Sequence, residues 1–348
     1  MVWVIMLLQT AVAATLAGQV VWQGGTQDGE WHDAGNWKDG AVPTAEDIVS
    51  IRATPECQVS GASPASARYM TVGGGVTLFV RGEGASLRVG TSLNLSGGTL
   101  RQKGGSINCA TLGVRRGAYS GTRGSLTVGK SISVGSAGGK GTVTIAGVDG
   151  SVGQVVYNGP GKIKGTAPGH GEIAVSGGSL RVNGNLFNAH HMWSKPLPEG
   201  QEHCGRLTVS GGEVNVAGNF YNGFGPDVSQ VQGVLEIVGA KGRMTVEGDF
   251  VQIEGSTLVT ELSGPEHTVI RVLGNARLAG TLKVRLAKGY TPQPETWWNI
   301  LQGSVGSPIG TFAALDFTEA GGADGWRVEY DTDERVVRVG YCPASGAQ

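Results

Sequence analysis

Short runs of alternating apolar and polar residues recur along most of the chain and are separated by glycines. Clear examples are 76–80 (VTLFV), 86–89 (SLRV) and 142–145 (TVTI). Because successive side chains of a strand point to opposite faces, this period of two predicts β-strands with one buried face. Beyond the N-terminal segment, no stretch of the sequence has the periodicity of an amphipathic helix. The pattern therefore predicts an all-β protein built from many short strands.

The strands belong to a repeat. Residues 175–189 (VSGGSLRVNGNLFNA) and 209–223 (VSGGEVNVAGNFYNG) are identical at eight of fifteen positions, and a looser copy covers 243–250. A glycine followed by Asn or Asp marks each copy, at 184, 218, 248 and again at 274, with separations of 34, 30 and 26 residues. Landmarks that stay stacked while the connecting loops vary in length are typical of a solenoid.

The shortest interval indicates how many strands a coil contains. Three strand-like pieces, 250–253, 257–262 and 268–273, fit between the last two landmarks. Three strands per coil predict the triangular cross-section of a single-stranded parallel β-helix, with roughly 25–35 residues per coil and coils ~4.8 Å apart. The marked turns predict a stacked ladder, in which glycines supply positive φ and side chains hydrogen-bond between coils. Its members are Asn185, Asn219, Asp249 and Asn275.

Composition supports this fold class and limits the partners. Of the 348 residues, 61 are Gly and only 16% are charged, against usual shares of about 7% and about 25%. So many glycines disfavour helices, while 39% hydrophobic residues suffice for a core. The formal net charge of -1 gives no overall attraction to nucleic acid or acidic membranes, so nucleic acid is not an expected partner.

The N-terminus is typical of an exported protein. An apolar run from Met1 to Leu8 leads to small residues up to Ala17, which predicts a signal peptide over 1–17. A buried first strand is the alternative. The run also departs from the usual signal pattern because no Lys or Arg precedes it, which a true start further upstream would explain. No other segment approaches the ~18 apolar residues of a membrane span. The mature chain is therefore expected to lack a transmembrane span and to be secreted or at the cell surface.

Four cysteines are compatible with this location. An exported chain could form two disulfides from them, and the alternative is that they are buried thiols. Their spacing leaves the pairing open. The residues are Cys57, Cys109, Cys204 and Cys342.

Both ends of the chain resemble a known class. Residues 21–51 contain Trp-Gly-Gly, a second Trp, Asn-Trp, a Pro and an Asp, which are Trp22, Gly24, Gly25, Trp31, Asn36, Trp37, Pro43 and Asp47. Residues 269–312 contain LAGTL, GYTP, WNIL and GTF in that order. This arrangement resembles secreted autotransporter-passenger-type proteins, here without their C-terminal barrel. The resemblance implies a right-handed parallel β-helix, and it says little about function because these are packing and turn motifs.

The chain divides into four parts on these grounds. They are a signal peptide over 1–17, an N-terminal cap segment over 18–51, a parallel β-helix over 52–316, and C-terminal strands, cap and tail over 317–348. An aromatic N-terminal cap is expected because the open end of a solenoid exposes strand edges and core.

Three sets of residues are candidates for chemistry. Glu247 and Asp249 are two positions apart on one predicted strand, so their carboxylates would lie on the same face, roughly 7 Å apart. Glycoside hydrolysis requires a carboxylate pair at about this separation. An insertion at 189–205 contains four side chains of the kinds that bind metal ions, His190, His191, His203 and Cys204. The alternative is that this insertion is an ordinary surface loop. Trp22, Trp31 and Trp37 would form a sugar-binding platform if they did not form the cap.

One motif match does not fit the predicted fold. Residues 124–131 (GSLTVGKS) fit the pattern of a phosphate-binding loop. Such a loop lies between a strand and the N-terminus of a helix, whereas these residues are themselves strand-like and precede another strand. No nucleotide and no other cofactor is therefore expected.

Together these features predict a secreted or surface-associated, adhesin-like or structural protein without enzymatic activity. Its expected partner is a polysaccharide or another cell-surface component. The alternative is a polysaccharide-active enzyme, a lyase or glycoside hydrolase, that uses Glu247 and Asp249. A purely structural part of a larger surface assembly is the third hypothesis.

Overall fold

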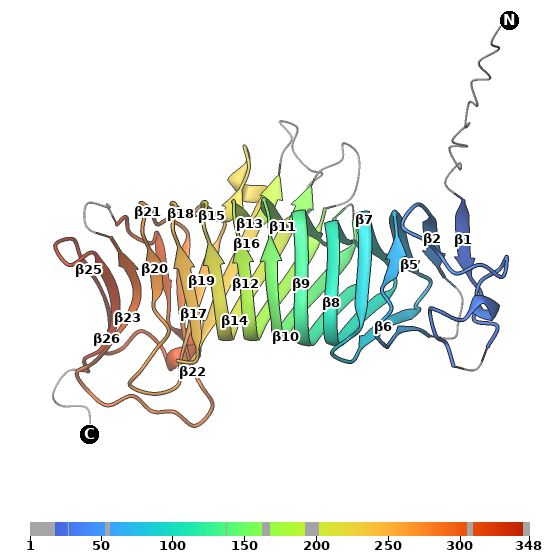
Figure 1. Ribbon diagram of the computed structural model, residues 1–348. Helices are drawn as coiled ribbons and strands as arrows, with labels where there is room; N and C mark the ends of the chain where they lie inside the picture. The colour runs from blue at the N-terminus through green and yellow to red at the C-terminus, as the bar shows by residue number, and fades with distance from the viewer. Residues whose placement is uncertain are drawn as a thin grey trace, which may run out of the picture.

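The protein is an elongated all-β molecule, with its first strand at one end and its last two strands at the other (Figure 1). In the computed structural model the described residues are 18–26, 28–52, 56–136, 138–161, 168–191, 202–304 and 309–343, so the predicted signal peptide lies outside them. They form one sheet of 26 strands, most of them paired in parallel. Three one-turn 3-10 helices complete the fold: η1 (Ala34–Asn36), η2 (Val228–Gln230) and η3 (Thr318–Ala320). The prediction of an all-β, solenoid-like repeat fold is confirmed.

The parallel pairings run as three ladders along the molecule, which we call A, B and C. Ladder A contains β1 (Gln19–Trp22), β2 (Ile48–Ile51), β5 (Tyr69–Gly73), the ends of β7 (Ser86–Ser96), β8 (Thr99–Val114) and β9 (Ala118–Val134), then β11 (Val155–Gly161), β13 (Leu186–His191), β15 (Phe220–Phe224), β18 (Phe250–Gln252) and β21 (Ala276–Arg277).

Ladder B contains β3 (Cys57–Val59), β6 (Thr77–Arg81), the starts of β8 and β9, the starts of β10 (Lys140–Val152), β12 (His170–Val182) and β14 (His203–Val216), then β16 (Val231–Val238), β19 (Thr257–Leu262), β22 (Thr281–Leu286) and β24 (Ala314–Asp316).

Ladder C contains β4 (Ala65–Ala67), the start of β7, the middles of β8 and β9, the ends of β10, β12 and β14, then β17 (Gly242–Val246), β20 (Ile270–Val272) and β23 (Thr296–Gly303). It closes with the antiparallel strands β26 (Val336–Tyr341) and β25 (Trp326–Asp331).

The coils vary in length more than the sequence predicts. Ser92 lies beside Thr111, 19 residues further on, whereas Asn185 and Asn219 in the later coils are 34 residues apart. The expected 25–35 residues were inferred from the landmarks of the later coils, so the shorter early coils were missed. Three strands per coil is correct.

The interior is filled by aligned rows of apolar side chains, most of them aliphatic. In ladder B one such row runs without interruption over nine coils, and every member is at most 2% exposed. Burial of each of these side chains contributes roughly 1.5–3 kcal/mol. The row consists of Leu78, Leu100, Tyr119, Val143, Ile173, Leu207, Leu235, Leu258 and Leu282.

The two ends differ from the expected domain limits. At the N-terminal end, β1 and β2 already pair in parallel and stack on β5, so residues 18–51 begin ladder A as well as covering its end. At the other end, antiparallel pairing begins at β23, before residue 317. The closing sheet therefore grows out of the last coils rather than following them.

The predicted turn ladder is present, although its glycines act differently from the prediction. The Oδ1 atoms of Asn185, Asn219 and Asp249 each accept the backbone N–H of the next member at 2.8 Å, as far as Asn275. Gly184, Gly218, Gly248 and Gly274 do not have positive φ. A Cβ on Gly218 would lie 2.5 Å from Asn185 Oδ1, so glycine is needed here for the close approach of neighbouring coils.

Three further sequence features can be placed. All four cysteines are free thiols in the structure. Residues 124–131, the phosphate-loop match, lie inside the continuous strand β9, with no helix after them. Within the described ranges there is no helix whose length and apolar character would let it cross a membrane.

Candidate ligand-binding face

The two candidate catalytic carboxylates do not share a strand. β17 ends at Val246 and β18 begins at Phe250, so Glu247 and Asp249 lie in the turn between them. Asp249 Oδ1 accepts hydrogen bonds from the backbone N–H and the Nδ2 of Asn275, at 2.8 and 3.1 Å. The prediction of a same-face carboxylate pair is wrong, because the strand ends before the pair and Asp249 holds the turn ladder together.

The three tryptophans of the N-terminal segment are fully buried. Trp22, Trp31 and Trp37 are each 0% exposed, and Trp37 packs edge-on against both others with ring centroids 5.0 and 4.8 Å away. The Trp37 indole also donates to the Trp31 carbonyl at 2.8 Å. No ring face is open to a sugar, so the platform hypothesis fails and the cap interpretation fits the packing.

The predicted metal ligands are divided between different surroundings. His190 packs among aromatic rings, whereas His203 lies beside His191 and accepts the backbone N–H of Gly169 on its Nδ1 at 3.1 Å. Burial, with His191 and His170 nearby, lowers the pKa of His203 to about 4. Across the part of the chain that the structure describes, no three His, Cys, Asp or Glu side chains are placed to hold a metal ion. Trp193, which belongs to the same insertion, lies outside the described residues.

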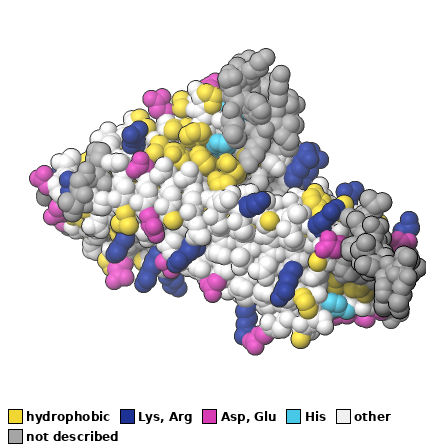
Figure 2. Space-filling view, turned by 45° about the horizontal axis from the view of Figure 1, so that its top comes forward, with side chains coloured by type: hydrophobic (Ala, Val, Ile, Leu, Met, Phe, Trp, Pro, Cys, Tyr) yellow, Lys and Arg dark blue, Asp and Glu magenta, His cyan; other side chains and the backbone are white. Residues whose placement is uncertain are grey.

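An aromatic row on the outer face of ladder A was not predicted. Tyr157, Phe187 and Tyr221 stack nearly face to face, with centroids 5.4 and 4.8 Å apart, and Phe224 packs edge-on against the last two. Figure 2 shows hydrophobic side chains gathered near a histidine on the upper side of the molecule. Because the rings cover one another's faces, the row stabilises the coil stack and offers mainly ring edges to a ligand.

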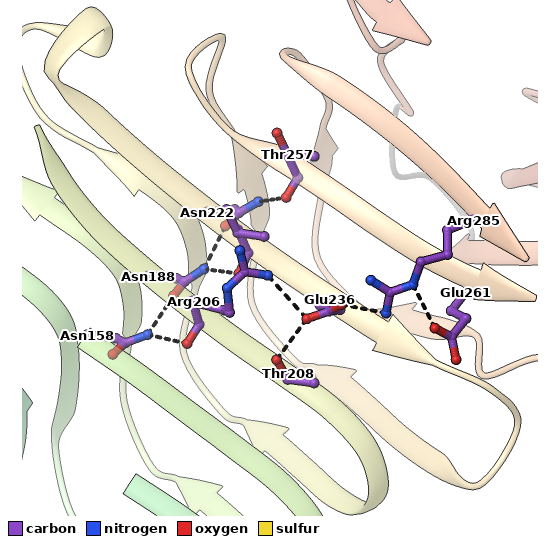
Figure 3. A network of polar contacts seen from close by, with 10 residues as sticks. Asn158, Asn188, Arg206, Thr208, Asn222, Glu236, Thr257, Glu261 and Arg285 are labelled. Atoms are coloured by element: carbon purple, nitrogen blue, oxygen red, sulfur yellow. Dashed lines mark hydrogen bonds and ion pairs between the residues drawn. The ribbon is translucent and has the colours of Figure 1, made fainter. Parts of the chain in front are cut away.

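A second polar ladder runs inside the molecule, and sequence reasoning also missed it. Asn158 Nδ2 donates to Asn188 Oδ1, and Asn188 Nδ2 donates to Asn222 Oδ1, both at 2.8 Å (Figure 3). Asn222 Nδ2 continues the row by donating to Gln252 Oε1 at 3.0 Å. These four residues, the buried amide ladder, are at most 2% exposed. Each Asn also donates to a carbonyl of ladder B, those of Arg206, Val234 and Thr257.

Glycines of ladder B make room for the amides. Gly171, Gly205 and Gly233 are partners on adjacent strands. A Cβ on Gly171 would lie 2.2 Å from Asn158 Oδ1, and one on Gly233 would lie 2.5 Å from Asn222 Oδ1. The amide ladder therefore fixes the corner between ladders A and B from inside, and it sets the position of the outer face above it.

That outer face carries a network of paired charges in its C-terminal half. Glu236, 8% exposed, accepts from Arg206 at 3.2 Å and Arg285 at 2.6 Å, and Thr208 also donates to it. Arg285 reaches Glu261 at 2.6 Å as well (Figure 3). Burial by itself would raise the pKa of Glu236, but Arg285, Thr208 and Arg206 outweigh it and hold the pKa below its ordinary value.

An open hollow lies on the same face, in the middle of the molecule. It has a volume of about 240 Å³ and crosses β10, β12, β14 and β16. Charged and other polar side chains line it on neighbouring strands, and Gly171 and Gly205 lie between them. The side chains are those of Lys140, His170, Glu172, Cys204, Arg206 and Gln232.

The hollow is suited to binding rather than to thiol chemistry. Cys204 and His170 are partners on adjacent strands, an arrangement that could suggest a nucleophile and a base. However, burial and nearby Glu202 raise the pKa of the Cys204 thiol, so the thiol stays protonated at neutral pH. What remains is a row of hydrogen-bond donors and acceptors, with Lys140 and Glu172 paired at 2.9 Å.

Comparisons of the chain with protein-family models, curated proteins and solved structures give no match. The fold defines an all-β, solenoid-like repeat protein. The features suited to ligand binding lie on its outer faces. The sequence did contain a signal for the amide ladder, because Asn188 and Asn222 are among the identical repeat positions. Each comes two residues after the buried Leu186 or Phe220, which places it on the inward face of its strand.

Proposed function

We propose that the protein is a secreted or surface-associated, adhesin-like protein without enzymatic activity, which binds a polysaccharide along the outer face of ladder B. We also propose that its solenoid is a right-handed parallel β-helix of the autotransporter-passenger type. The sequence resemblance supports the second proposal, and the apolar N-terminal run supports export.

The hollow on ladder B is the observation that carries the binding proposal. Polysaccharides are recognised through many hydroxyl groups, which need convergent donors and acceptors on a fixed surface. Lys140, Glu172, Arg206 and Gln232 provide such groups on adjacent strands. The buried amide ladder below holds these strands in place, so that binding does not have to order them.

The structure does not support the two carboxylates proposed for a polysaccharide-active enzyme. Asp249 is engaged in the turn ladder, and Glu247 lies with it in a turn. We therefore expect bound polysaccharide to keep its chain length.

A binding measurement on the purified chain tests this function. Polysaccharides of known length, both neutral and acidic, are titrated by calorimetry, and their length is measured afterwards. We expect saturable binding of at least one polymer, unchanged length, and several-fold weaker binding by the double variant His170→Ala, Gln232→Ala. Gln302→Ala, an exposed glutamine on ladder C, is the control and should bind normally. Shortened polymer, or no binding of any polysaccharide, would contradict the proposal.

A further inference from the structure

The charges are distributed unevenly along the chain, although its net charge is close to zero. Residues 57–148 contain ten Lys or Arg and one acidic residue, Glu83, for a formal charge of +9, although the whole chain carries -1. This segment covers the N-terminal coils from β3 to the first half of β10. The cations of the molecule are therefore concentrated where almost no carboxylate can neutralise them.

Four of these cations lie on β6, β8 and β9, on the outer face of ladder B. Arg81, Lys103 and Arg123 are direct partners on β6, β8 and β9, three neighbouring strands (Figure 1). Arg101 lies two residues before Lys103, as the partner of Phe79. We call these four residues the basic patch. Its cations recur once per coil, and neighbouring coils are ~4.8 Å apart.

The patch is not neutralised within the described part of the chain. Only Arg123 has an ion pair there, with Glu83 at 2.5 Å, and both of those side chains are more than two-thirds exposed. Such an exposed pair contributes little and exchanges readily. By contrast, all four Lys and Arg that strands β10 to β24 contribute to this face are paired with carboxylates; they are Lys140, Arg206, Lys283 and Arg285.

Phe79 holds two of the cations in place. The Arg81 guanidinium lies 3.8 Å from the centre of the Phe79 ring and the Arg101 guanidinium 6.0 Å, while Phe79 itself is 4% exposed. Stacking of this kind fixes long side chains without using up their hydrogen-bond donors. The fixed donors can meet an anion with a smaller loss of side-chain entropy.

We propose that the basic patch binds an acidic polysaccharide, with one carboxylate or sulfate of the ligand per coil. This inference rests on the proposed function and deepens it, by naming the ligand class and a second contact on the same face, on the strands that precede the hollow. An extended polysaccharide lying along the solenoid axis advances by about one sugar per coil, since the coil spacing of ~4.8 Å is close to the length of one pyranose unit. Thr99 and Ser120 lie beside the cations and add hydroxyl groups for the sugar hydroxyls.

Other polyanions fit the patch less well. Single-stranded nucleic acid is bound by stacking its bases on open aromatic faces, and Phe79, the aromatic ring among these cations, is covered by Arg81. An acidic membrane surface attracts basic residues most strongly when apolar groups insert beside them. Thr99 and Ser120 beside the cations carry hydroxyl groups, and the apolar Phe79 is only 4% exposed, so it is not free to insert into a membrane.

The test compares an acidic polymer with its neutral counterpart. Full-length protein is titrated with polygalacturonate and with the same polymer after complete methyl esterification. We expect at least about tenfold tighter binding of the acid form at ~0.1 M salt, weakening as salt rises. The double variant Arg101→Gln, Lys103→Gln should lose about tenfold in affinity for polygalacturonate. The control Arg271→Gln, Arg277→Gln makes the same charge change on β20 and β21 and should lose less than about twofold.

The possible outcomes separate this inference from the proposed function. Equal binding of both polymers, or equal effects of the two double variants, would overturn the inference and leave polysaccharide binding intact. Absence of binding to any polysaccharide would overturn both. Tighter binding of single-stranded DNA or of phosphatidylserine vesicles than of polygalacturonate would also overturn the inference. A circular dichroism spectrum of each variant establishes that the fold is retained.

Discussion

The N-terminal and C-terminal coils differ both inside and outside, although they share the same three ladders. At one inward row of ladder A, the early coils carry Ile51, Val72, Leu95, Val114 and Val134, whereas the later coils carry Asn158, Asn188, Asn222 and Gln252. On the outer face of ladder B, the early cations are mostly unpaired within the described residues, and the later ones are paired.

This contrast shows that the polar ladders are not required for coils to stack. At this row the early coils stack through aliphatic side chains, which stabilise by burial and need no hydrogen bonds to one another. The later coils carry the hollow, beneath which buried amides fix a corner that apolar contacts would leave less well defined. Among the described residues, only one of the four cations in the basic patch has an ion pair, which is what the proposed binding of an acidic polysaccharide requires.

The largest expected effect comes from crowding the amide ladder. In Gly233→Ala the new Cβ would lie 2.5 Å from both Asn222 Oδ1 and the backbone N of Gly223, so the corner must shift. We expect a loss of about 3–5 kcal/mol in the free energy of unfolding, measured with urea. Gly264→Ala is the control, because nothing lies within 4 Å of its new Cβ. Equal stability of the two variants would show that the corner is not tightly constrained.

The next effect tests the amide ladder directly. Asn188→Leu roughly keeps the side-chain volume but leaves the Asn158 Nδ2, the Asn222 Oδ1 and the Val234 carbonyl without their partner. Buried groups left unpaired cost about 1–3 kcal/mol each, so we expect a loss of about 3 kcal/mol. The control Asn215→Leu, on the partly exposed outer face of ladder C, should change stability by less than about 0.5 kcal/mol. A small loss in Asn188→Leu would mean that the later coils, like the early ones, rely on apolar stacking.

Acid should weaken the C-terminal coils first. Burial lowers the pKa of His267 to about 4, and burial with neighbouring histidines does the same for His203. Both histidines are neutral in the fold but gain a proton when unfolded below about pH 6.5, so stability is full above that pH and falls towards pH 4. We expect a loss of a few kcal/mol over this range. Hydrogen exchange at pH 5 should rise in β14 and β19 before β6 to β9, and a uniform rise would contradict the prediction.

A smaller effect separates the two halves of the outer face. Glu236→Gln removes the charge shared by Arg206 and Arg285, and we expect it to cost about 1–2 kcal/mol. Arg101→Gln, Lys103→Gln should leave stability within about 0.5 kcal/mol, because it removes like charges without ion pairs in the described structure. Thermal unfolding of both variants measures this difference. A similar loss in both would mean that the basic patch has a structural role.

The repeat made the solenoid predictable, whereas the register between coils did not follow from it. Gly-Asn landmarks identified the turn ladder correctly, because Asn185 and Asn219 are marked by the preceding glycine. The inward position of Asn188 and Asn222 depends on where each strand starts after the turn, and one residue of shift would have turned them outward. Arg81, Lys103 and Arg123 are neighbours only because the early coils are short, which the later repeats did not reveal.

The candidate chemistry failed for similar reasons. Glu247 and Asp249 alternate in the sequence, but the strand that would have placed them on one face ends at Val246. The tryptophans could be a platform or a cap on composition alone, and only their complete burial decides between the two.

The basic patch of the early coils is the proposed contact for an acidic polysaccharide. Hydrogen–deuterium exchange of the full-length protein, with and without polygalacturonate, locates the contact directly. We predict slower exchange in residues 77–81, 99–103 and 118–123 on ladder B, extending at most to the neighbouring strands that line the hollow, β10, β12, β14 and β16, with no change in β19, β22 and β24. Protection of β19, β22 and β24 without protection of those three segments, or no protection at saturating polymer, would contradict the proposal.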